Sequence, residues 1–245
     1  MNTDIDSLIT GVSVTWNTKD LIEKAISSIR KFHPTMHILI ADGSEKKDEC
    51  YSFLDEIKGK YLTVNHFDYN IGHGRGLHFG LQKAQTPYVL YFDSDIEMVK
   101  SPLEGMLAMM EDNTYGVGYI EYVARDGHDF GVFPRHKGQT PVKYMHPYFQ
   151  LVQVKEAKKY QPPIHHGAPC IATMLDIHDR GLSDIVLKEY KCLGHTNGCG
   201  MSWKPCEGEY VIHNVMGFGG TGKMRVAKGL PHIEGQWANP MGTRR

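Results

Sequence analysis

The chain has 245 residues, of which 41% are hydrophobic and 22% are charged, and its formal net charge is −1. This composition is typical of globular proteins and excludes a disordered chain or a coiled coil. No apolar stretch approaches the ~18 residues that a membrane-spanning helix needs, and the polar N-terminus lacks the layout of a signal peptide. We therefore expect a cytoplasmic protein without a transmembrane segment.

Strand-like and helix-like segments alternate from residue 8 to residue 95. Short apolar, β-branched segments predict strands at 8–16, 37–42, 61–67 and 88–92. Apolar residues at helical spacing predict helices at 21–32, 50–58 and 77–85. Such alternation is typical of βαβ units, so we predict an α/β fold with a mostly parallel central sheet flanked by helices.

Polar loops follow three of these strands. They contain Asp42, the segment 70–75, and Asp93 to Asp95. Ligands of open α/β sheets bind beyond the carboxyl ends of the strands, so the three loops should meet at one edge. After residue 130 the pattern is less regular, because six prolines between positions 134 and 169 interrupt it.

Charge is distributed unevenly along the chain. Residues 1–129 carry 12 Lys and Arg against 20 Asp and Glu, whereas residues 130–245 carry 15 against 8. The basic second half favours an anionic ligand or acceptor. Five cysteines without an export signal predict reduced thiols. Cys192, His195, Cys199 and Cys206 lie close enough in sequence to hold zinc, but no C-x-x-C pair supports that site, which stays open.

Asp93-Ser94-Asp95 is the strongest chemical signal. The apolar segment YVLYF leads directly into these two carboxylates, which are costly beside a core strand unless a cation or hydrogen-bond donors meet them. Carboxylate oxygens are ligands that Mg²⁺ and Mn²⁺ prefer, and such an ion can also hold two phosphates. We predict a metal site here, with Asp93 and Ser94 also close to a bound diphosphate.

Three segments of the first 100 residues carry a more specific signal. They read VSVTWNTKDLIEKAISSIRK, HILIADGS and NIGHGRGLHFGLQKAQTPYVLYFDSDIEM. In order and spacing they resemble the nucleotide-binding half of family 2 glycosyltransferases with the GT-A fold. The resemblance implies a nucleotide-sugar donor, a UDP-sugar by expectation, and Mn²⁺ or Mg²⁺ as cofactor. It also implies donor-binding roles for Thr15, Trp16, Asn17, Asp42, Asn70, Gly72 and Arg75.

Several of these residues also have a purely structural interpretation. Trp16 could be a core aromatic, Asp42 could form a turn, and Gly72 could simply interrupt regular structure at a turn. The family often takes a further metal ligand, a histidine, from a strand well downstream. His213, at the end of the segment YVI, matches that position. The resemblance therefore implies a metal site of Asp93, Asp95 and His213.

Residues 217–223, GFGGTGK, match the phosphate-binding loop of nucleoside triphosphatases. Position 224 is Met, which cannot replace the Ser or Thr that binds magnesium, and only 21 residues follow this position. A glycine-rich loop with Lys223 and Arg225 suits closure over the donor diphosphate. A basic tail is the alternative.

An inverting transferase needs a general base near the acceptor hydroxyl. Family members usually carry a Glu-Asp pair in the region that follows residue 165, and this sequence has none. Asp179 and Asp184 are the candidates that remain, with helix capping or solvent exposure as the alternative for each.

We therefore predict a single GT-A-like domain over 1–245, with a nucleotide-sugar-binding half at 1–100 and an acceptor-side half with a C-terminal loop at 101–245. It would transfer a sugar to an acceptor hydroxyl with inversion. A glycan, a lipid-linked sugar, a protein and a modified nucleic acid all stay open as acceptors.

Two other functions stay open. One is a nucleotide- or polyanion-binding module without transferase activity, built around residues 217–223. The other is a sugar-phosphate nucleotidylyltransferase, whose basic glycine-rich loop would be expected after the first strand, where this chain has TWNTKD.

Overall fold

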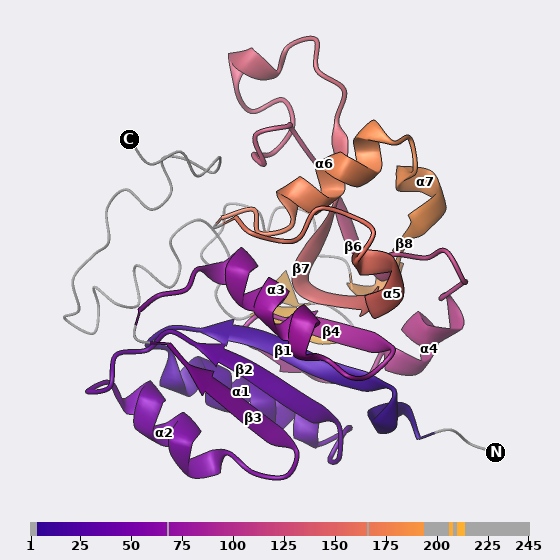
Figure 1. Ribbon diagram of the computed structural model, residues 1–245. Helices are drawn as coiled ribbons and strands as arrows, with labels where there is room; N and C mark the ends of the chain where they lie inside the picture. The colour runs from indigo at the N-terminus through magenta and orange to yellow at the C-terminus, as the bar shows by residue number, and fades with distance from the viewer. Residues whose placement is uncertain (1–3, 68, 166, 194–205, 208–209, 214–245) are drawn as a thin grey trace.

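The computed structural model describes residues 4–67, 69–165, 167–193, 206–207 and 210–213 (Figure 1). The strands are β1 (Ile9–Thr15), β2 (His37–Asp42), β3 (Leu62–His66), β4 (Tyr88–Phe92), β5 (Ile96–Met98), β6 (Gly116–Val123), β7 (Val142–Gln153), β8 (Leu187–Glu189), β9 (Cys206–Glu207) and β10 (Val211–His213). The α-helices are α1 (Lys19–Arg30), α2 (Glu49–Ile57), α3 (His73–Lys83), α4 (Leu103–Ala108), α5 (Val154–Ala157), α6 (Ile171–Asp179) and α7 (Ser183–Val186). Short 3₁₀ helices are η1 (Ile5–Ser7), η2 (Pro134–His136) and η3 (Lys191–Leu193).

Seven strands form one sheet in the order β3-β2-β1-β4-β7-β6-β8. β1 to β4 pair in parallel, and β6 and β8 are also parallel to each other. β7 is the exception, since it runs antiparallel to its neighbours β4 and β6. The mostly parallel sheet predicted from the sequence is therefore confirmed.

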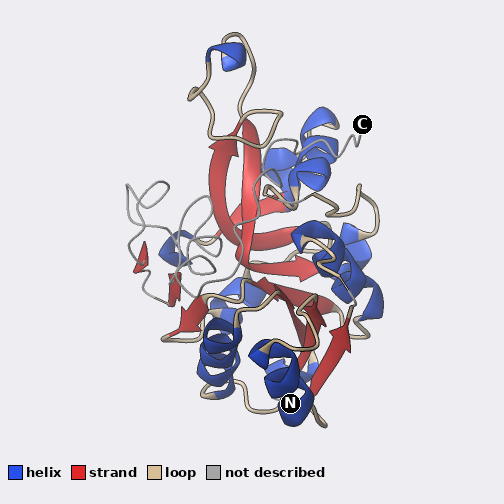
Figure 2. Ribbon diagram, turned by 90° about the vertical axis from the view of Figure 1, so that its left-hand side faces the viewer, coloured by secondary structure: helices blue, strands red, loops and turns tan. Residues whose placement is uncertain are grey.

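Helices cover both faces of this sheet (Figure 2). In β4 the side chains alternate between the two faces, because Leu90 and Phe92 pack in one core cluster while Val89 and Tyr91 pack in the other. The first cluster includes residues of α1, α2 and α4, and the second includes residues of α3, α5 and α6. Strands buried on both faces read as continuous apolar runs, as YVLYF does.

The second half of the chain, where the sequence pattern is irregular, contains β7, the longest strand that the structure describes. Prolines interrupt the sequence pattern in this region, so the pattern does not predict the strand. Pro147 lies where the β6–β7 register shifts, since Gly118 pairs with Gln150 but Ile120 already pairs with Met145. Proline lacks a backbone N–H and is tolerated in a sheet mainly at edges and bulges. The shift therefore accommodates Pro147, and β7 continues past it.

β5, β10 and β9 form a small second sheet with the strand order β5-β10-β9. β10 pairs antiparallel with β5, and His213 is opposite Ile96. Among the helices that the structure describes, none is long and apolar enough to cross a membrane.

Two glycines let α3 approach β1 closely. A Cβ at Gly76 would lie 2.5 Å from Val14 Cγ2, and one at Gly80 would lie 2.2 Å from Val12 Cγ1. Real Cβ atoms do not come this close to a branched side chain. The glycines therefore set the distance between α3 and the sheet, and with it the position of the loop that precedes α3.

Replacing Gly80 with alanine is expected to lower the free energy of unfolding by about 1–3 kcal/mol, because the added methyl overpacks the α3–β1 contact. The higher helix propensity of alanine, worth about 1 kcal/mol, offsets only part of this. Urea denaturation measures the change. Gly59→Ala is the matched control, since a Cβ there meets nothing within 4 Å. Equal stability of the two variants would show that the contact is not tight.

Candidate metal and nucleotide site

The order of the strands reverses between β1 and β4, because the chain passes from β1 to β2 on one side and later returns to β4 on the other. Ligands of open α/β sheets bind at such a switch point, beyond the carboxyl ends of the strands. Asp93 to Asp95 follow β4 here, and Trp16 and Asn17 follow β1. The fold thus brings one of the three predicted polar loops, Asp93 to Asp95, to the expected place beside the loop that follows β1.

Asp93, Asp95 and His213 form a compact group of possible metal ligands. Each offers one ligand atom, and these atoms all lie within 4.8 Å of one another. His213 Nε2 is 3.0 Å from Asp95 Oδ1 and 3.7 Å from Asp93 Oδ2. The β5–β10 pairing explains the contact, because it places His213 opposite Ile96, the residue that follows Asp95.

Two further histidines lie at this group that the sequence did not single out. His73, the first residue of α3, places Nε2 3.1 Å from Asp93 Oδ1. His146 comes from the register shift of β7, and its ring centroid is 6.5 Å from that of His213. Tyr148 stacks on His213 with ring centroids 5.1 Å apart. The signal for His73 was its place within the glycine-rich segment 70–76, where α3 begins.

The electrostatics show a site where positive charge is favoured. Burial raises the pKa of Asp93, but His73, His213 and His146 outweigh burial and hold the pKa below its ordinary value. Burial lowers the pKa of His213, but Asp95 and Asp93 outweigh it and raise the pKa. Burial lowers the pKa of His146 to about 4, so this ring is neutral at pH 7.

The side chains of Asp93, Asp95 and His213 form a ligand set that fits a divalent cation. Two carboxylates and an imidazole converge, and in proteins carboxylate ligands suit Mg²⁺ and Mn²⁺ while imidazole is a general ligand for transition metals. Asp95 and His213 are buried, at 7% and 6% exposure. A cation held by these residues would replace the proton that the raised pKa of His213 favours.

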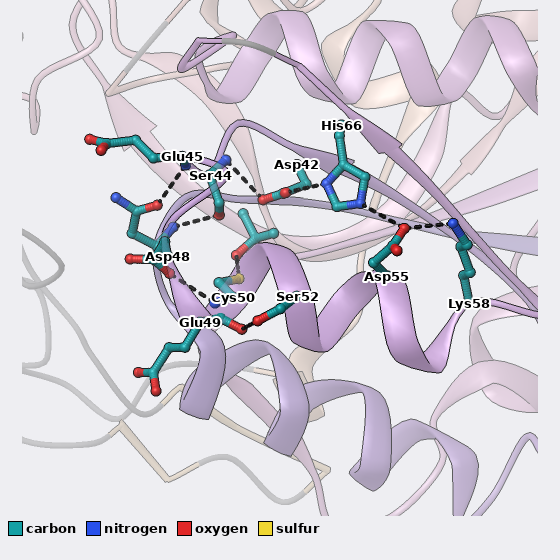
Figure 3. Close-up of polar contacts among 12 residues, drawn as sticks. Asp42, Ser44, Glu45, Asp48, Glu49, Cys50, Ser52, Asp55, Lys58 and His66 are labelled. Atoms are coloured by element: carbon teal, nitrogen blue, oxygen red, sulfur yellow. Dashed lines mark hydrogen bonds and ion pairs between the residues drawn. The ribbon is translucent and has the colours of Figure 1, made fainter.

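The predicted nucleoside end of the site is built around Asp42, at the end of β2. Figure 3 shows its carboxylate between Ser44 and His66. The Ser44 N–H donates to Asp42 Oδ1 at 3.0 Å, and His66 Nδ1 lies 2.7 Å from Asp42 Oδ2. The Asp42 side chain is fully buried, whereas His66 is partly exposed and stacks on Tyr51 at 3.8 Å. In this arrangement Asp42 orients His66, whose side chain is partly exposed while its Nε2 atom is buried.

The loop after β1 is tied to the same turn. Asn17 has a positive φ of 54°, a conformation that asparagine adopts more readily than most residues. Its N–H donates to Ser44 Oγ at 2.8 Å, and its Oδ1 accepts from the Glu45 N–H at 3.2 Å. Thr15 Oγ1 contacts Thr18 Oγ1 at 2.7 Å. These bonds join the loops after β1 and β2 into one rim.

The other residues that were predicted to bind the nucleotide-sugar lie mostly along the loop before α3 and at the start of that helix. Asn70 Oδ1 accepts from the Gly72 N–H at 3.0 Å, and Gly72 has a φ of 83°, which favours glycine. Arg75 is exposed on α3, and Ser94 is partly buried between the two aspartates. Lys223 and Arg225 lie outside the described residues, as do His195 and Cys199 of the possible zinc group.

The two candidate bases have ion-pair partners. Arg125 contacts both carboxylate oxygens of Asp179, at 2.7 and 2.8 Å, and its hydrogen bond lowers the pKa of Asp179. Asp184 is exposed and pairs with Lys143, whose hydrogen bond lowers the pKa of Asp184. A lowered pKa makes a carboxylate a weaker base. Catalytic roles for Asp179 and Asp184 remain predictions.

Comparison with known proteins supports the architecture. The family model "Glycosyl transferase family 2" matches residues 12–176. The chain is 30% identical to β-1,4 N-acetylgalactosaminyltransferase 1 of Homo sapiens over 109 residues, which is 44% of this chain and 19% of the relative. It is also 30% identical to the Rattus norvegicus protein over 111 residues, with the same shares. The matched region thus spans about a fifth of these curated relatives.

A solved structure shares the fold. It is a mannosyltransferase from Pyrobaculum calidifontis in complex with GDP-Man and Mn²⁺, with a TM-score of 0.54 at 12% identity. The likeness covers 74% of this chain and 54% of that chain. Together with the sheet order, it confirms the GT-A-like α/β fold predicted from the sequence.

Replacing His66 with alanine is expected to cost about 1–3 kcal/mol of unfolding free energy, since it removes the hydrogen bond to the buried Asp42 Oδ2 and leaves the Ser44 N–H bond to Oδ1 in place. Urea denaturation measures the loss. His37→Ala is the control, because His37 bonds Thr63 at an exposed position and its loss should cost less. If both variants lose the same free energy, Asp42 does not depend on His66.

Proposed function

Because the chain belongs to glycosyl transferase family 2, we propose that it transfers a sugar from a nucleoside diphosphate to an acceptor hydroxyl. The donor is a nucleotide-sugar, with a UDP-sugar as first choice. The observation that carries the proposal is the convergence of Asp93, Asp95 and His213 within 4.8 Å at the switch point of the sheet. The relatives from Homo sapiens and Rattus norvegicus are glycosyltransferases, which supports the proposal.

In this proposal Asp95 and His213 hold a Mn²⁺ or Mg²⁺ ion with Asp93. When bound, the ion would meet the negative charge that develops on the leaving diphosphate. His73 bonds Asp93 and so fixes the orientation of that carboxylate. The neutral His146 ring accepts a hydrogen bond from the Tyr148 N–H at 3.2 Å, which holds the β7 segment next to His213.

The rim formed after β1 and β2 binds the nucleoside, with Thr15, Trp16 and Asn17 on one side. Asp42 acts there through His66, which it orients. The loop of Asn70 and Gly72, with Arg75, lies on the phosphate side. We extend the proposal to inversion at the transferred sugar, and to a closing role for Lys223 and Arg225 over the diphosphate. The acceptor is proposed to be anionic, in keeping with the basic second half of the chain.

Nucleotide binding is expected to depend on the metal. A ligand present at about 100 times its Kd stabilises the native state by about 2.7 kcal/mol, which raises Tm by several degrees. We expect UDP with Mn²⁺ to give this shift in a thermal denaturation assay, and UDP with EDTA to give little. GDP with Mn²⁺, tested in parallel, identifies the base.

Asp95→Ala should abolish the metal-dependent shift, because it removes one of two buried ligands. Asp112→Ala is the matched control, since Asp112 is an exposed carboxylate in the turn before β6. A shift that is unchanged by EDTA and by Asp95→Ala would contradict the metal site. The absence of any shift with either nucleoside diphosphate would contradict nucleotide-sugar binding.

A further inference from the structure

Glu121 is a carboxylate in an unusual position on the main sheet. It lies on β6, directly opposite Tyr144 of β7, and is partly buried. Within the part of the chain that the structure describes, no hydrogen bond or ion pair meets its carboxylate. Buried carboxylates without such partners are rare in proteins, because taking the charge out of water is costly.

A row of aromatic rings connects this position to the candidate metal ligands Asp93, Asp95 and His213, called the metal group below. Along β7, Tyr144 and His146 have ring centroids 5.8 Å apart, and His146 and Tyr148 have centroids 5.4 Å apart. Tyr148 stacks on His213 and also contacts Tyr119, two residues before Glu121, with centroids 6.3 Å apart. Glu121 therefore lies at one end of this row, and the metal group lies at the other.

The electrostatics confirm that the two groups act on the same tyrosines. Burial raises the pKa of Tyr148 and of Tyr144, and the charges of Asp93 and Glu121 both raise these pKa values further. Both carboxylates are thus within electrostatic reach of the same pair of rings.

Glu121 also has the proton affinity that a general base needs. Burial raises its pKa to about 7, and the charge of Asp129 adds to the effect. The other titratable groups that face it are Tyr119 on its own strand and Tyr144 and Tyr148 on β7, while Glu189 of β8 faces Tyr119. No cation from the described residues pairs with Glu121, in contrast to Asp179 and Asp184.

We propose that Glu121 is the general base that accepts the proton of the acceptor hydroxyl, an inference that rests on the proposed glycosyl transfer. The acceptor oxygen forms the new bond to the anomeric carbon as its proton passes to a Glu121 oxygen. The bond from the anomeric carbon to the diphosphate breaks, and its electron pair leaves with the nucleoside diphosphate. Glu121 then releases the proton to solvent.

The test uses the full-length protein with UDP-GlcNAc, UDP-GalNAc and GDP-mannose as donors and Mn²⁺ as the ion. Donor consumption is measured with water as the acceptor and with a panel of soluble glycosides. Glu121→Gln is expected to lower kcat at least ~100-fold, in the range that general bases contribute, with KM for the donor unchanged. The thermal shift given by UDP and Mn²⁺ should equal that of the wild type.

The pH profile separates a base from a structural residue. The base must be ionised, so wild-type kcat should rise with pH through an apparent pKa near 7, and Glu121→Gln should lose this limb. Glu121→Asp should retain part of the activity. Glu189→Gln is the matched control on the neighbouring strand and should behave as the wild type.

The outcomes distinguish the two proposals. If Glu121→Gln turns over like the wild type, Glu121 is not the base, and the glycosyltransferase proposal stands. If the wild type neither consumes a donor nor binds UDP with Mn²⁺, the proposed function fails and the role of Glu121 fails with it. Titration of the Glu121 carboxyl by ¹³C NMR, assigned with Glu121→Gln, needs no turnover. An inflection near the ordinary value for glutamate overturns the inference.

Discussion

The site depends on one constraint, which is that two carboxylates stand at the end of a strand buried on both faces. Asp93 and Asp95 follow YVLYF so closely that their charge cannot simply be left to solvent, and His73 and His213 meet it in the structure. These histidines come from a helix start and from β10, which are far apart in the chain. The need to neutralise the pair therefore links α3, β5 and β10 to the switch point of the main sheet.

The first half of the fold could be predicted from the sequence because its signals are local. Apolar runs such as 8–16 and the helical spacing of 21–32 correspond to β1 and α1 with small shifts at the ends. β7 could not be predicted in this way. Pro147 interrupts its pattern, and only the register shift opposite Tyr119, a feature of long-range pairing, explains how the strand accommodates it.

The same distinction separates the site residues. Asp93, Asp95 and His213 each follow a recognisable apolar segment, so their positions were predictable, although their metal role stays a prediction. His146 and Tyr148 reach the site only through the irregular part of β7, and Glu121 only through the pairing of β6 with Tyr144. Asp42 was predicted as a nucleoside contact, whereas the structure encloses its carboxylate and leaves only part of the His66 side chain exposed. Burial of this kind follows from packing and has no signature in a single sequence.

The antiparallel direction of β7 gives the site its second side. β7 pairs with β4 only from Phe149 onward, so residues 142–148 extend beyond the carboxyl end of β4, where β6 is their partner. Because β7 approaches from beyond the site, it carries Tyr144 and His146 past Asp93 and holds Glu121 of β6 in the same region. One reversed strand thus holds the proposed base, Glu121, beside the strand that extends past β4, while the parallel strands supply the loops of the proposed donor site.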